Sequence, residues 1–198
     1  MFKIKTFLIL FFICCISYSQ EQLKLYKSIY ETSDSLKKVN KILEIDKTVF
    51  KEAKKLDQEH PSKYLEIAGT YIAKSKFNEA SFFYFLGVMR YQYYNKASQN
   101  YRASSDGALL GSLSYTTSQS ILPYLKTDIN NYISILKMTI HYYKKNDYLF
   151  FSKSNNIEKY NHELNLILEQ KTNLENNKTK YTNLWDLEIK KQRTALKI

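Results

Sequence analysis

The sequence predicts an all-α protein, a helical bundle that contains one helical hairpin. Apolar residues recur at intervals of three and four over most of the chain, which is the spacing of amphipathic helices. The chain has only four glycines and two prolines, fewer than turn-rich β-sandwiches and barrels need. With 44% hydrophobic and 15% aromatic residues, its length suits one domain with a sizeable core.

Residues 1–19 are predicted to be a secretory signal peptide. Two lysines precede an uncharged run over residues 6–16, and Ser17 and Ser19 place small side chains where a signal peptidase reads, so we expect cleavage between Ser19 and Gln20. The run is shorter than the roughly 20 residues that span a bilayer, which disfavours an uncleaved anchor. We therefore expect a bacterial protein that is periplasmic or secreted, with no transmembrane segment in the mature chain.

The two cysteines, Cys14 and Cys15, both lie inside that signal. The mature chain would therefore have no disulfide and no thiol nucleophile. Lipidation is a less favoured alternative, because the residue before Cys14 is Ile13 and lipoprotein cleavage sites have a small residue there.

The formal net charge is +11. Lysines are spread along the chain among acidic residues, there are three arginines, and no dense basic block occurs. This distribution argues against nucleic acid as a partner. A membrane-surface or polyanion binder remains an alternative.

A first helical segment is expected over residues 20–60. Ser33-Asp34-Ser35 is predicted to interrupt it, because such side chains compete for backbone hydrogen bonds. Residues 39–45 fit either a helix or an extended stretch. The segment should end before Pro61, since a residue that precedes proline disfavours helix.

A helical core is expected over residues 61–150. One helix starts at Pro61, a polar turn follows at Lys74-Ser75-Lys76, and a second helix runs from about Asn78 to Ala97. The second helix is apolar almost all round, which is typical of a central helix that is covered on several sides.

Residues 61–97 resemble a single tetratricopeptide-type helix pair. The matching positions are Tyr64, Ile67, Ala68, Tyr71, Phe77, Ala80, Tyr84 and Gly87. The small residues among them would let two antiparallel helices approach closely. The repeat's closing proline is absent, and the neighbouring stretches do not match, so the resemblance implies one hairpin and no solenoid. Phe83-Tyr84-Phe85-Leu86-Gly87 also resembles a stretch in uncharacterised exported bacterial proteins, which implies no activity.

Two further helices are expected in the core and one or two in the tail. A short helix should end before Pro123, and an amphipathic helix should cover residues 124–145. Residues 151–198 form a polar C-terminal helical arm, broken at Asn173–Asn177. This arm is either a packing arm or a partner-binding extension.

No residues in the sequence form a catalytic, cofactor or metal motif. His60, His141 and His162 lack the spacing of a helical metal pair. Ser114 lacks the glycine-flanked turn of a hydrolase nucleophile. Glu66 and Glu79 are not placed by sequence as a facing glycosidase pair.

Arg90 is the anomaly of the most apolar helix, because a charge there must pair or face a cavity. One interpretation pairs it with a carboxylate such as Asp106 or Glu79. The other makes it line a partner-binding groove with Tyr91 and Tyr94 that recognises an anionic or aromatic group.

These observations predict an exported protein-interaction module without catalytic activity. A periplasmic immunity protein that neutralises a toxin is one alternative. A wall- or glycan-acting hydrolase that uses scattered carboxylates is another.

Overall fold

The computed structural model describes Gln20 and residues 22–198, and within these residues every regular element is a helix. The predicted signal peptide, with Ser19 and both cysteines, lies outside this range. The helices are an N-terminal helix over residues 22–38, α2 (Thr48–Leu56), α3 (Ser62–Ala73), α4 (Phe77–Ala97), α5 (Ala108–Lys126), α6 (Ile129–Lys145), α7 (Ile157–Asn176) and α8 (Lys178–Leu196), with short turns η1 (Ala103–Gly107) and η2 (Lys153–Asn155). The predicted all-α bundle is confirmed.

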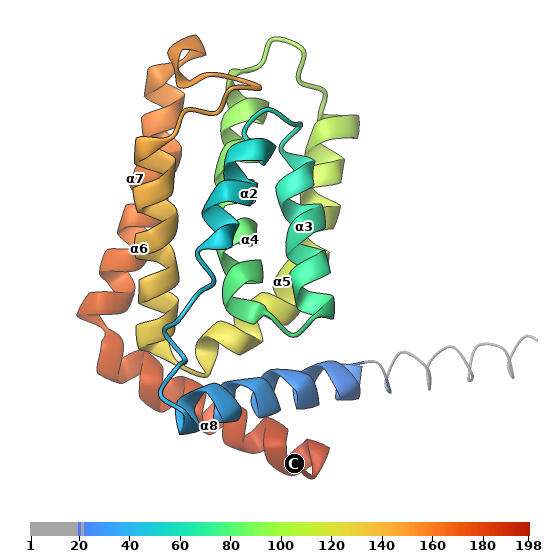
Figure 1. Cartoon of the computed structure of the whole chain (residues 1–198), viewed down its shortest axis with the longest axis vertical. Coiled ribbons are helices and arrows are strands. Elements are labelled where there is room, and N and C mark those ends of the chain that lie inside the picture. Colours follow the sequence, from blue (N-terminus) through green and yellow to red (C-terminus); the bar gives the residue numbers. More distant parts are fainter. Residues whose placement is uncertain (1–19, 21) are drawn as a thin grey trace, which may run out of the picture.

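Helices α2 to α7 run alternately up and down along one axis (Figure 1). Three connections gather at the top of this view, over residues 57–61, 98–107 and 146–156, and we call this the loop end. At the opposite end the N-terminal helix and α8 cross beneath the bundle. Among the described residues, no helix is both long enough and apolar enough to cross a membrane.

Helix α4 is the centre of the bundle and packs against α3, α5, α6 and α7. It forms an antiparallel hairpin with α3 through a short turn, in which Ser75 adopts a left-handed conformation with φ 54°. The small residues act as expected, since Ala68 and Ala80 are fully buried between the helices. At Gly87 an added Cβ would lie 2.6 Å from the Cβ of Tyr64, so only glycine permits this approach.

We therefore expect Gly87→Ala to lower the free energy of unfolding by about 1–3 kcal/mol, because the helices must separate to admit the methyl group. Urea unfolding measures the change. Gly69→Ala is the matched control, since Gly69 is exposed on α3 with nothing within 4 Å of its added Cβ. The control should be neutral or stabilising, and equal losses in both variants would contradict the close approach.

The break in the N-terminal segment lies later than predicted. The N-terminal helix continues through Ser33, which is fully buried and donates to Thr127 Oγ1 at 2.8 Å. Residues 39–47 are neither helix nor strand, and the Nδ2 atom of Asn78 on α4 holds them by donating to the carbonyls of Ile42 and Glu44. The prediction that Ser33 interrupts the helix was therefore wrong, because its hydroxyl binds Thr127 in the turn between α5 and α6.

The boundary between α5 and α6 also differs from the prediction. Helix α5 continues through Pro123 to Lys126 and does not stop before the proline. Tyr124 and Leu125 are fully buried, and this burial secures the last turn although Pro123 offers no N–H. Helix α6 begins only at Ile129, where the Asp128 carboxylate caps it by accepting from the Asn131 N–H.

The C-terminal arm consists of two helices that meet at Asn177, as the asparagine-rich stretch predicted. Helix α8 packs against the N-terminal helix. Arg193 pairs with Asp34 at 2.8 Å, and its guanidinium carbon lies 4.6 Å from the centre of the Tyr30 ring. The N-terminal helix and α8 therefore stabilise each other's position at this end of the bundle.

Candidate functional site

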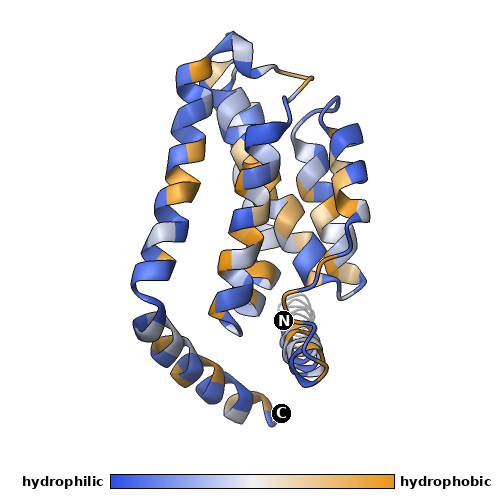
Figure 2. Cartoon of the chain, turned by 60° about the vertical axis from the view of Figure 1, so that its left-hand side comes forward, coloured by the Kyte–Doolittle hydropathy of each residue, from blue (hydrophilic) through white to orange (hydrophobic). Residues whose placement is uncertain are grey.

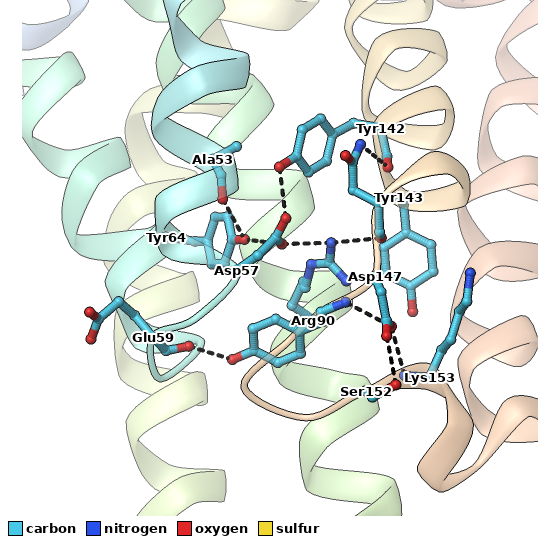
Figure 3. Close-up of polar contacts among 12 residues, drawn as sticks. Ala53, Asp57, Glu59, Tyr64, Arg90, Tyr142, Tyr143, Asp147, Ser152 and Lys153 are labelled. Carbon is cyan, nitrogen blue, oxygen red and sulfur yellow. Dashed lines mark hydrogen bonds and ion pairs between the residues drawn. The ribbon is translucent and has the colours of Figure 1, made fainter.

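Arg90 pairs with Asp57, and neither Asp106 nor Glu79 is its partner. Its Nη2 atom lies 2.7 Å from Asp57 Oδ1, and both side chains are buried (Figure 3). Asp57 directly follows α2, so this ion pair joins α2 to the central helix at the loop end. The expected carboxylate partner is thus present, but the two residues suggested for it were wrong, because Asp57 looked only like a residue that ends a helix.

Hydrogen bonds and aromatic rings surround the ion pair. Tyr64 donates to Asp57 Oδ1 at 2.6 Å and Tyr142 donates to Oδ2 at 2.8 Å. Burial raises the pKa of the Asp57 carboxyl, and Arg90 and the two hydroxyls oppose that rise. The Arg90 guanidinium carbon lies 4.9 Å from the ring centre of Tyr148 and 5.3 Å from that of Tyr143. The Arg90 charge is thus paired with a carboxylate that two hydroxyls hold in place, and it lies against two ring faces.

The same network fixes the loop over residues 146–156. Arg90 donates to the Asn146 carbonyl at 3.1 Å, and the Phe150 N–H donates to the Asp57 carbonyl at 2.8 Å. Asp147 secures the loop internally, because its carboxylate accepts from the N–H groups of Tyr148 and Lys153 and from the Ser152 hydroxyl (Figure 3). The loop is therefore anchored at its first residue and at Phe150.

His60 occupies an aromatic cluster beside the ion pair. The centre of its ring lies 5.2 Å from that of Tyr91, 5.6 Å from that of Tyr94 and 5.7 Å from that of Phe150. Its Nε2 atom is 3.8 Å from the Asp106 carboxylate. Asp106 thus faces His60, and the cluster joins all three connections of the loop end.

Of the three residues predicted to bind a partner, only Tyr94 reaches the surface. Arg90 and Tyr91 are fully buried, and Tyr94 is half-buried. Burial raises the pKa of Tyr91 to about 12. Arg90 therefore supports the loop end from within, and the structure does not make it part of an exposed groove.

The structure shows a groove along α4 that the sequence reasoning missed. Tyr84, Val88 and Gln92 follow one another at four-residue intervals on α4 and stay partly exposed, whereas the rest of the helix is largely buried. The groove is lined by Tyr84, Phe85, Val88, Met89, Gln92, Leu122, Glu163, Leu166, Ile167 and Gln170. The signal in the sequence was that α4 is apolar on every side. The neighbouring helices cover only part of this apolar surface.

The other candidates have local partners or face solvent. His141 and His162 are exposed, and the Ser114 hydroxyl donates to the Gly111 carbonyl of its own helix. Glu66 pairs with a lysine of its own helix, and Glu79 accepts from the Asp46 N–H. No group of three potential metal ligands occurs among the described residues.

No protein-family model, curated protein or solved structure matches this chain.

Asp57→Asn is expected to lower the free energy of unfolding by about 3–5 kcal/mol, because it leaves the Arg90 charge buried without its partner. Chemical denaturation measures this loss. Asp34→Asn is the matched control: its partner is Arg193 at an exposed site, so it should cost at most about 1 kcal/mol. Similar small losses in both variants would show that the bundle does not depend on the buried pair.

His60 should make stability depend on pH. Burial lowers the pKa of its imidazole below the ordinary value of 6.5, and Asp106 partly opposes this shift. The unfolded chain then binds the proton more readily, so this contribution is present above about pH 6.5 and is lost as the pH falls through the folded-state pKa. His60→Asn should flatten the loss between about pH 7.5 and 5.5, as measured by urea midpoints, whereas the exposed His141→Asn should not. A slope unchanged by His60→Asn would refute this assignment.

Proposed function

We propose that this protein is an exported protein-interaction module without catalytic activity, and that the α4 groove receives an apolar segment of its partner. One observation carries the proposal. Helix α4 is apolar almost all round, and four helices pack against it, but the strip of Tyr84, Val88 and Gln92 stays partly uncovered. With Leu122, Leu166 and Ile167 beside this strip, the groove has a mostly apolar lining with a few polar groups, which is typical of binding sites.

The walls of the groove suit a helical segment. Leu122 of α5 stands on one side and Leu166 of α7 on the other, and both side chains are exposed. An amphipathic helix binds such a groove with apolar residues at three- and four-residue intervals. The buried Glu163, paired with Lys96 at 2.6 Å, and the exposed Gln170 add polar positions that can orient the segment.

The tetratricopeptide-type resemblance of residues 61–97 agrees with this proposal, since scaffolds of packed helix pairs commonly bind peptides and proteins. An immunity protein is one form that such a module takes, and its partner would then be a toxin.

Affinity capture tests the proposal. The chain carries a C-terminal tag, is recovered after export, and is examined for copurifying protein by mass spectrometry. We expect one stoichiometric protein partner, and a chain that begins at Gln20. Leu122→Gln combined with Leu166→Gln should reduce the captured partner by at least about tenfold, because the groove loses apolar contact area.

Leu184→Gln combined with Leu187→Gln is the matched control, because both leucines are exposed on α8 and lie outside the groove. This control should capture the partner as the parent chain does. Retention of the same partner by the groove variant would exclude the groove, and a folded chain that captures no protein would count against an interaction module.

A further inference from the structure

The loop end exposes a group of large apolar side chains. These are Tyr101, Leu109, Leu149, Phe150 and Ile157, and they come from the two longer connections and from the first turns of α5 and α7. Leu149 and Phe150 are consecutive and are 60% and 42% exposed. Figure 2 shows a hydrophobic stretch at the projecting tip of the connection between α6 and α7. The apolar residues thus lie at the extremity of the bundle.

The apolar tip does not arise from a loose loop that has failed to fold inward. The N–H of Phe150 is bonded to Asp57, and the Tyr148 hydroxyl donates to the Glu59 carbonyl at 2.8 Å. The Phe150 ring packs against Tyr94 with its centre 5.8 Å away. The fold therefore leaves Leu149 exposed and the Phe150 ring partly exposed on top of the His60 cluster, and this apolar surface costs solvation free energy unless something covers it.

Basic side chains lie at the helix ends that lead into the loop end. Lys54 and Lys55 lie in the last turn of α2, and Lys144 and Lys145 in the last turn of α6. All four are exposed, and among the described residues none has a carboxylate within ion-pair distance. Exposed Arg102 adds a further charge.

The acidic groups of the loop end are mostly engaged. Asp57 pairs with Arg90, Asp147 accepts three hydrogen bonds, and Asp106 faces His60. The carboxylates of Glu59 and Glu158 remain exposed. Asp106 and Asp147 keep their negative charge, so four carboxylates stand against the five basic residues, and the surface presents apolar side chains with a slight excess of positive charge.

We propose that the loop end docks onto an anionic lipid surface, with Leu149 and Phe150 entering the boundary between headgroups and acyl chains. A projecting apolar tip with lysines at the adjoining helix ends fits a surface that is negatively charged outside and apolar beneath. The α4 groove runs along the side of the bundle, so this docking is independent of the proposed function.

Vesicle sedimentation tests the docking. The exported chain is mixed with phosphatidylcholine vesicles that contain about 30% phosphatidylglycerol, and with vesicles of phosphatidylcholine alone. We expect binding to the anionic vesicles that weakens as salt is raised, and little binding to the neutral ones. Leu149→Gln combined with Phe150→Gln should lower the partition coefficient about tenfold. Glutamine at Lys54, Lys55, Lys144 and Lys145 together should lower it at least as much.

The Leu184→Gln and Leu187→Gln pair is again the control, since it removes two exposed leucines from the opposite end. It should bind vesicles as the parent chain does, and circular dichroism should show every variant folded. Absent binding, or equal binding by the parent and the tip variant, overturns the proposal. So does a tip variant that loses a captured protein partner and keeps its vesicle binding, because the tip would then be a protein interface.

Discussion

The ion pair between Asp57 and Arg90 is the interaction on which the loop end depends. Placing a guanidinium in the most apolar helix is costly unless the charge is paired and hydrogen-bonded. Asp57 provides the opposite charge, Tyr64 and Tyr142 complete the coordination of its carboxylate, and two further tyrosine rings flank the guanidinium. The pair thereby fixes where α2 ends and where the loop after α6 must lie.

The helical periodicity was enough to predict the fold class, the turn between α3 and α4, and the break near Asn177, because these depend on local pattern. Local pattern did not reveal the course of residues 39–47 or the passage of α5 through Pro123. Both are determined by contacts between segments far apart in sequence, through Asn78 in the first case and through burial of Tyr124 in the second.

The candidate site was predicted in part. A buried charge in an apolar helix is visible in sequence, and Arg90 was singled out for that reason. Its partner was not predicted, since Asp57 stands four residues before Pro61, where the sequence also indicates the end of a helix. The exposed strip of α4 and the exposed tip at Leu149 depend on which helix faces the packing leaves uncovered. The periodicity of a single sequence shows that a helix face is apolar, but which segment of the chain covers that face depends on the packing of the whole bundle.

The contact between the N-terminal helix and α8 has a consequence for the order of folding. Arg193 donates to Asp34 although 159 residues separate them, so the contacts between these two helices form only after the last helix has been synthesised. The hairpin of α3 and α4 consists of local contacts and can form earlier. Because its first helix packs against its last, this end of the bundle stays incomplete while the chain is being made.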